Sequence, residues 1–153
     1  MAGFRPKRMD KDKLDEMIMD CIECVISADA DVTEMYWWLS AIPETLRYLY
    51  RKRKRIVRKI DDVTDRLDEI SAKFRLVYIH SSRASGNITE KKDFADSMKL
   101  ARSPEYKKLK TELNVYTEIL NAIDADITNV EQKSVMVRKM TNIESSRVVY
   151  DED

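Results

Sequence analysis

Two segments of this chain carry the same apolar repeat, with apolar residues alternating at intervals of three and four over residues 46–77 and again over 106–137. An average spacing of 3.5 residues keeps one stripe of a helix facing a partner helix, as in a coiled coil. Each stripe would be roughly 47 Å long. The two equal stripes therefore predict a long antiparallel helical hairpin. The first stripe consists of Leu46, Leu49, Arg53, Ile56, Ile60, Val63, Leu67, Ile70, Phe74 and Val77, and the second of Tyr106, Leu109, Leu113, Tyr116, Leu120, Ile123, Ile127, Val130, Ser134 and Val137.

The composition favours helices throughout the chain. The 153 residues include only two glycines and three prolines, which leaves little material for strands and turns, and 37% of the residues are charged. We expect an all-α fold with short N-terminal helices before the hairpin, forming a single domain over residues 1–153. The expected segments are a loose basic lead at 1–9, N-terminal helices within 10–42, hairpin helices at 44–80 and 104–143, and an acidic tail at 148–153.

Local signals predict the ends of the N-terminal helices. The first helix is expected over 12–28, on the 3-4 spacing of Leu14, Met17, Cys21, Cys24 and Ala28. Asp31 followed by Glu34 is typical of a helix cap with its reciprocal acid. Pro43 should then break or kink the chain, because proline has no N–H and disfavours helix at the preceding residue.

Other signals divide the second half of the chain. Residues 81–88 form the clearest loop, and Thr89 can cap a short helix reaching about residue 101. Ser103, Pro104 and Glu105 then mark the start of the last helix, with serine as the cap, proline in the first turn and an acid near the helix dipole.

Two kinds of partner have no support in the sequence. There is no run of about 18 apolar residues and no apolar signal core near the start, so we expect no membrane partner and a cytoplasmic protein. The pair Cys21 and Cys24 with the single histidine His80 falls short of a zinc ligand set. We expect both cysteines to pack in the core, and neither a metal nor a cofactor.

A basic segment begins near the start of the first long helix. Between Arg47 and Lys59 there are eight basic residues in thirteen and no acid, although the whole chain balances 28 basic against 28 acidic residues. Most of them fall outside the apolar stripe, and Trp37, Trp38, Tyr48 and Tyr50 are close in sequence. Such a pattern suits a nucleic-acid backbone with stacked bases. The predicted contacts in this segment are Arg51, Lys52, Lys54, Arg55, Arg58 and Lys59.

A solvated or protein-docking face is the alternative, because long coiled coils are highly charged. In an antiparallel hairpin whose opposing residue numbers sum to about 183, Lys59 would meet Asp126, and Lys73 would meet Glu105 or Glu112. Such flanking ion pairs are worth a few tenths of a kcal/mol each, about what exposed pairs contribute. The residues that point outward have no partner of this kind in the sequence, which favours nucleic-acid contact.

Two further patterns bear on function. An acidic cluster at 61–69, with Asp20 and Glu23 as a second pair, is the basis for a third and weaker hypothesis, an α-helical nucleotide hydrolase, but there is no phosphate-binding loop and no catalytic residue can be assigned. The last helix also carries a second apolar strip, which must meet either the N-terminal helices or another subunit. The predicted oligomer interface on this strip is Val115, Ile119, Met136, Met140 and Ile143.

Several elements, read in order over residues 36–145, resemble the UvsY family, the recombination mediators of T-even-type phages and their relatives. The elements are Trp38-Leu39 near the end of an early helix, the basic helix, Lys73, Arg75 and Leu76 followed by Tyr78, a Ser/Gly/Arg loop at 81–86, and a long helix reading Leu113-Asn-Val-Tyr116 through Ile123-Asp124-Ala125 to Arg138.

The resemblance implies a function and a set of partners. A member of this family is a small helical homo-oligomer that loads a RecA-like recombinase onto single-stranded DNA coated with a single-strand-binding protein, without being an enzyme. In a phage-encoded protein the compartment would be the host cytoplasm. The resemblance also implies that Lys73 and Arg75 contact DNA. A coiled-coil adaptor that binds only protein partners is the alternative.

Overall fold

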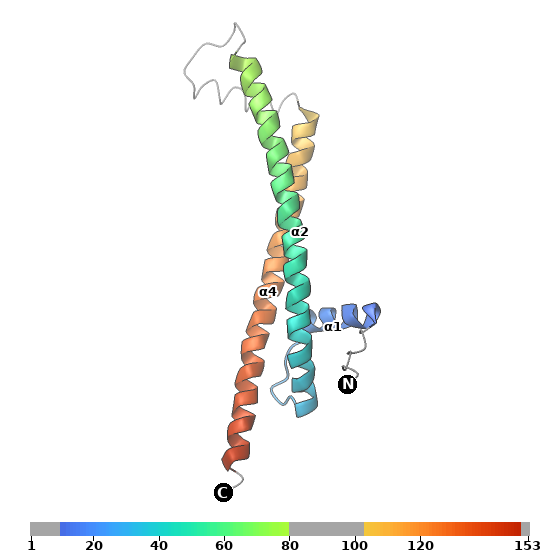
Figure 1. The fold of residues 1–153 in the computed structure, drawn as a ribbon, viewed down its shortest axis with the longest axis vertical. Coiled ribbons are helices and arrows are strands. Elements are labelled where there is room, and N and C mark those ends of the chain that lie inside the picture. Colours follow the sequence, from blue (N-terminus) through green and yellow to red (C-terminus); the bar gives the residue numbers. More distant parts are fainter. Residues whose placement is uncertain (1–9, 80–102, 151–153) are drawn as a thin grey trace, which may run out of the picture. The chain divides into compact units, whose positions relative to one another are not determined.

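The computed structural model describes residues 10–79 and 103–150, and these ranges contain three helices (Figure 1). They are α1 (Lys11–Glu23), α2 (Val32–Ile79) and α4 (Pro104–Tyr150). The all-α fold is thus confirmed for the described part of the chain. The chain groups into two compact units, unit 1 (Met1–Lys52 with Ile123–Asp153) and unit 2 (Arg53–Ala122), and α2 and α4 each pass through both.

Side-chain caps stand at the first turns of α2 and α4, at the two positions where the sequence predicts a cap. The backbone N–H of Glu34 donates to the Asp31 carboxylate at 2.8 Å, and the N–H of Tyr106 donates to the Ser103 hydroxyl at 3.1 Å. Each bond satisfies one of the N–H groups that the first turn of a helix leaves without an intrahelical acceptor. The caps predicted at Asp31 and Ser103 are confirmed, but the expectation that the first long helix begins at residue 44 is wrong, because Asp31 caps α2 itself.

Helix α1 ends at Glu23, five residues before its predicted end, so extending the 3-4 spacing through Cys24 and Ala28 is wrong. Cys24 is exposed and has extended backbone angles, with φ −76° and ψ 149°. The next buried residue is Ile26, at 5% exposure, in the connecting segment. The apolar spacing therefore did not mark the end of α1, since Ile26 is buried from the segment that follows the helix.

Pro43 does not break the chain into two helices, because α2 continues through this residue. The alternative, a kink at Pro43, stays a prediction. Pro43 cannot donate to the carbonyl oxygen of Leu39, four residues earlier. Leu39 and Pro43 both lie on the exposed side of the helix, where water can reach that oxygen. Just beyond, the fully buried Thr45 donates its hydroxyl to the carbonyl oxygen of Ala41 at 2.8 Å.

Helix α4 reaches Tyr150, seven residues past its predicted end, and so includes part of the segment expected as an acidic tail. The basic lead at 1–9, the loop at 81–88, the short helix capped by Thr89 and residues 151–153 lie outside the described residues.

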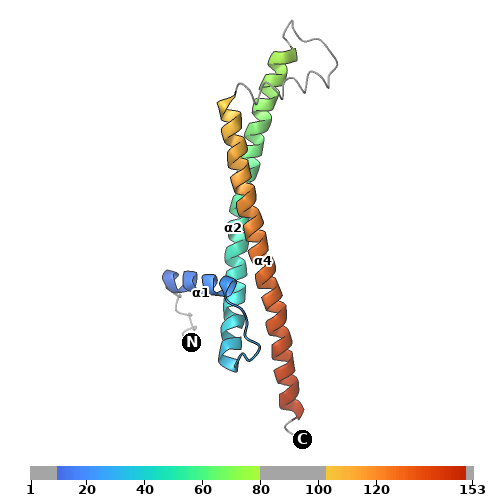
Figure 2. The ribbon, with the colours of Figure 1, turned by 180° about the vertical axis from the view of Figure 1, so that it is seen from behind.

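In unit 2 the apolar stripes of α2 and α4 pack on each other. Val63 and Leu67 of α2 form one buried cluster with Leu109 of α4. The partly buried residues packed against this cluster are Ile70, Tyr106, Leu113 and Tyr116. Figures 1 and 2 show the corresponding parts of the two helices side by side in both views.

The predicted pairing of Val77 with Tyr106 is wrong. Val77 is 71% exposed, whereas Tyr106 packs on the cluster that contains Leu67. The partners on α2 therefore come earlier in the sequence than a residue sum of 183 requires. Within unit 2 the repeat alone cannot fix this pairing, because apolar positions face apolar positions again after a shift of seven residues.

In unit 1, α1 lies against the first half of α2 in both views (Figures 1 and 2). The Lys133 ammonium on α4 donates to the carbonyl oxygens of Cys21 and Ile22, at 2.9 and 2.8 Å, in the last turn of α1. A cation at this end complements the helix dipole and satisfies carbonyls that lack an intrahelical donor. The same ammonium lies 5.5 Å from the centre of the Trp38 ring. Lys133 thereby joins α1, α2 and α4.

The two cysteines are free and differ in environment. Cys21 is fully buried, as expected, but Cys24 is exposed, so the expectation that both pack in the core is wrong for Cys24. Burial raises the pKa of the Cys21 thiol, against the opposing effects of the Thr45 hydroxyl and the Lys133 charge. Cys21 is therefore held as an unreactive thiol.

The buried cluster of unit 2 predicts a large loss of stability for Leu67→Ala. Removing the side chain, 6% exposed, deletes apolar contacts and leaves a cavity. The free energy of unfolding should fall by about 2–5 kcal/mol, measured by urea denaturation. Leu76→Ala on the same helix is the control, because Leu76 is 57% exposed and should change stability by no more than about 0.5 kcal/mol. Equal losses in the two variants would contradict this packing.

The Lys133 contacts predict that Lys133→Met loosens α1. Methionine keeps an apolar stem but cannot donate to the two carbonyl oxygens. In a Cys24→Ser background, a thiol reagent should label Cys21 about tenfold faster, since a charge-assisted hydrogen bond contributes about 1.5 kcal/mol to holding the site closed. Lys139→Met, at an exposed position of α4, is the control. Unchanged labelling in Lys133→Met would show that α1 is held by its apolar face alone.

Candidate nucleic-acid interface

The basic segment lies on helix α2, where most of its side chains are exposed to solvent. Arg51 and Lys52 belong to unit 1, and the later members belong to unit 2. Four members of the basic segment are exposed and, within the described part of the chain, make no ion pair, hydrogen bond or ring contact: Arg51, Lys54, Arg55 and Arg58. They lie between the buried stripe residues Leu49 and Val63 but outside the stripe, so the apolar stripe itself turns them outward.

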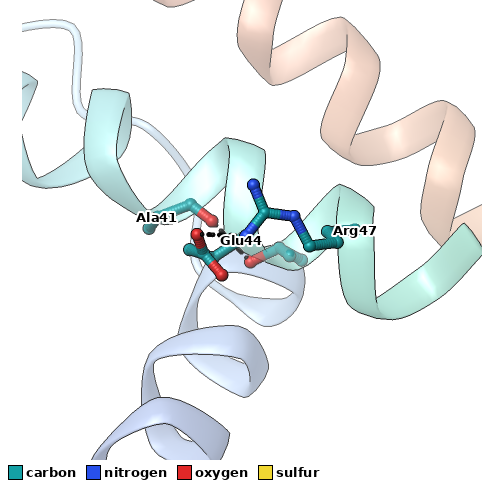
Figure 3. A network of polar contacts seen from close by, with 4 residues as sticks. Ala41, Glu44 and Arg47 are labelled. Atoms are coloured by element: carbon teal, nitrogen blue, oxygen red, sulfur yellow. Dashed lines mark hydrogen bonds and ion pairs between the residues drawn. The ribbon is translucent and has the colours of Figure 1, made fainter. Parts of the chain in front are cut away.

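Arg47 differs from these residues, because its charge is neutralised on its own helix. Its guanidinium donates to the Glu44 carboxylate at 2.9 Å, as the close view of this turn shows (Figure 3). The expectation that nothing nearby neutralises Arg47 is therefore wrong, since the acid stands just before the basic run. Arg53 is half-buried at its stripe position, as the repeat predicts. The free basic surface begins at Arg51.

Lys52 and Lys59 each lie near an aromatic ring. The Lys52 ammonium is 6.0 Å from the centre of the Tyr48 ring on α2, and that of Lys59 is 5.5 Å from the centre of the Tyr116 ring on α4. Both lysines are exposed, and such contacts are worth about 0.5–1 kcal/mol at the surface. The ammonium groups remain accessible to an anion. The alternative pairing of Lys59 with Asp126 stays a prediction.

Lys73 and Arg75 lie near the end of α2, and both are exposed. Among the described residues, Lys73 forms no ion pair with Glu105 or Glu112, so the expected flanking pair is absent. Arg75 likewise has no side-chain partner in this part of the chain. The expected ion pair with α4 therefore does not account for Lys73, and the side chains of Lys73 and Arg75 are free to contact a ligand.

The acidic residues that follow the basic run are exposed on the same helix. They are Asp61, Asp62, Asp65, Asp68 and Glu69. Within residues 10–79 and 103–150, no group of three acidic, cysteine or histidine side chains is placed to hold a metal ion. None of the three described helices has an apolar stretch able to cross a bilayer.

The second strip of α4 is only partly covered. Lys133, which lies along it, contacts α1, so the N-terminal helix meets the strip at that point. Val115 in unit 2 and Met136 in unit 1 are 48% and 45% exposed. Ile119 and Met140 are half-buried, and the side chain of Ile143 lies outside the described residues. A shallow groove beside Val115 is lined by Lys108, Thr111, Glu112 and Tyr116 as well.

The structure separates the four aromatic residues that the sequence groups with the basic segment. Trp38 is 2% exposed, and its indole N–H has no hydrogen-bond partner among the residues that the structure describes. Trp37 is half-buried and meets Trp38 edge to face, with ring centres 4.8 Å apart. Tyr48 and Tyr50 are 42% and 49% exposed, and the Tyr50 hydroxyl donates to Glu131 at 2.6 Å. The tryptophans belong to the packed interior of unit 1.

Sequence reasoning did not single out two residues that matter here. Tyr36 is 66% exposed on α2, and Lys133 joins three helices. The helical period alone could have placed Tyr36 outward, because it lies seven residues before Pro43. No local signal could have identified Lys133, whose acceptors are more than a hundred residues away in sequence.

Comparison of the chain with family models, curated proteins and solved structures finds no match.

Proposed function

We propose that this protein binds single-stranded DNA through the exposed basic face of α2 and acts as a recombination mediator without being an enzyme. The DNA-contacting set is Arg51, Lys52, Lys54, Arg55, Arg58 and Lys59, with Lys73 and Arg75 as additional contacts. The observation that carries the proposal is the row of exposed basic side chains without acidic partners. Lysine and arginine in such a row neutralise phosphates and release the counterions condensed on the strand.

The mediator role rests on the resemblance to the UvsY family. Under this proposal the partners are a RecA-like recombinase and a single-strand-binding protein, in the cytoplasm of a host cell. A protein that holds a strand by its backbone can present it to a recombinase, because the bases stay available for pairing. No cofactor is required for this activity.

The proposed scaffold is an antiparallel hairpin of α2 and α4 that assembles into a homo-oligomer. Contacts within each unit support the hairpin: Tyr50 bonds to Glu131 in unit 1, and Leu67 packs with Leu109 in unit 2. The partly exposed strip of α4 supports assembly, since large apolar side chains in a row are covered in most stable proteins. The interface would include Val115, Ile119, Met136, Met140 and Ile143.

A coiled-coil adaptor that binds only protein is the second candidate. The observation in its favour is the same set of exposed apolar side chains on α4, to which a different protein could bind. The two candidates differ in their ligand, so a titration with oligonucleotides at several salt concentrations separates them.

The basic face predicts that Arg51→Glu, Arg55→Glu and Arg58→Glu together weaken binding to a single strand. Log affinity should fall with log salt by about 0.7 per phosphate contact, and the triple variant should lose at least two contacts per subunit. Its slope should therefore be flatter by about 1.4 or more, measured by fluorescence anisotropy. The loss should not depend on base sequence, because phosphates carry no base information.

The matched control changes three exposed basic residues of α4, Lys107, Arg138 and Lys139, to glutamate. It alters the net charge by the same amount, so it isolates the position of the charges. Helicity should be unchanged in both triple variants. Tight binding by the α2 variant at every salt concentration would favour the protein adaptor.

The exposed strip predicts that the protein in solution is heavier than the 18.0 kDa of one chain. Val115→Asp with Met136→Asp should lower the molar mass measured by light scattering, because a buried charge opposes assembly. Both residues are exposed in the single chain, so helicity should persist. Thr117→Asp with Lys139→Asp, at other exposed positions of α4, is the control. A wild-type mass of one chain at micromolar concentration would show that the strip is not a subunit interface.

A further inference from the structure

Among the described aromatic residues near the basic segment, Tyr48 alone is exposed, has a hydroxyl without a hydrogen bond and lies beside exposed basic residues. Its ring is 42% exposed, and within the described residues its hydroxyl makes no hydrogen bond. Arg51 and Lys52 follow three and four residues later, so all three side chains share one face of α2. The Lys52 ammonium lies 6.0 Å from the ring centre, at the outer limit of a cation–π contact, so it holds the ring only weakly.

The other aromatic residues in this part of α2 are buried, already bonded or distant from the exposed basic residues. Trp38 is buried, and Trp37 packs edge to face against it. The Tyr50 hydroxyl is bonded to Glu131, which places a carboxylate where a strand would bring its phosphates. Tyr36 is exposed but stands three turns before Tyr48, away from the free basic residues.

The one acid on the Tyr48 side of this turn is already neutralised. Glu44 precedes Tyr48 by four residues and would repel a phosphate. Its carboxylate accepts a hydrogen bond from the Arg47 guanidinium at 2.9 Å, which cancels much of that repulsion (Figure 3). The surroundings of the ring are therefore neutral on one side and basic on the other.

We infer that Tyr48 stacks on a base of the bound strand while Arg51 and Lys52 hold the phosphates beside that base. This inference rests on the proposed function and extends it, because it assigns the preference for single strands to one residue. The bases of a duplex are stacked on one another and are not free to meet the ring, whereas those of a single strand are free. Stacking on an aromatic side chain tolerates any base sequence, since every base has a π face.

The test compares a thymidine oligonucleotide with a strand of equal length whose central residues are abasic. The abasic strand keeps every phosphate and removes only the bases. The wild-type protein should bind the thymidine strand about 5- to 150-fold more tightly, the range for stacking one base on an aromatic residue. Tyr48→Ala and Tyr48→Leu should reduce this preference to about one. Tyr48→Phe should keep it, because the ring remains.

Matched controls separate stacking from a general loss of binding. Tyr36→Ala removes a more exposed ring of the same helix and should keep the preference. Affinity for a duplex should be the same in wild type and Tyr48→Ala. Tyr48→Leu preserves apolar bulk and helix, and helicity measured by circular dichroism should be unchanged in every variant.

The outcomes distinguish this inference from the proposed function. If the wild-type protein binds neither strand at low salt, the proposed DNA binding is wrong and the inference fails with it. If the wild type binds both strands equally, phosphate contact stands and stacking is wrong. A preference that survives in Tyr48→Ala and Tyr48→Leu would place the stacking residue elsewhere and overturn the assignment to Tyr48.

Discussion

Burial of one apolar stripe on each long helix is the constraint on which the rest of the structure depends. Once Leu49 and Ile56 of α2 are turned inward, the helical period turns Arg51, Lys54, Arg55 and Arg58 outward. Truncating a buried stripe residue lowers the free energy of unfolding by about 2–5 kcal/mol. Losing an exposed ion pair lowers it by only a few tenths of a kcal/mol, on the order of 0.5. The direction of the basic residues is therefore a consequence of apolar packing, not of any charge interaction among them.

The faces of the helices could be predicted from the sequence, but their offset could not. Every residue of the two stripes except Val77 is buried or half-buried, because burial follows the 3-4 spacing directly. The caps at Asp31 and Ser103 could also be predicted, since a cap depends on atoms within three residues. The pairing of Val77 with Tyr106 failed, because a seven-residue shift leaves the pattern matched and only three-dimensional packing decides between the two registers.

Where a distant contact decides the outcome, the candidate site also escaped prediction. Lys133 reads as one more surface lysine on a charged helix, yet its ammonium bonds to the end of α1 and faces Trp38. Cys24 continues an apolar spacing but is exposed, because α1 has already ended. Arg47 is a different case: it reads as part of the basic run but is paired with Glu44, a local partner three residues earlier that the sequence could have shown. For the basic face of α2, the helical period alone was sufficient to predict which side chains are exposed, because each residue needed only to lie outside the apolar stripe.

The arrangement of charge along α2 limits how a strand can lie on it. Like charges three or four residues apart cost about 0.2–0.5 kcal/mol per pair, so the five such pairs among Arg51, Lys54, Arg55, Arg58 and Lys59 together destabilise the helix by about 1–2.5 kcal/mol. A bound strand can offset that amount with one or two phosphate contacts. Beyond Lys59 the exposed acids from Asp61 to Glu69 repel phosphates. The continuous basic track is then about 12 Å long, enough for only a few nucleotides. Lys73 and Arg75 lie past the acids, so under the proposed function they would contact a strand separately from the track. If the chain assembles through α4 and binds DNA as proposed, several chains acting together would lengthen the bound segment.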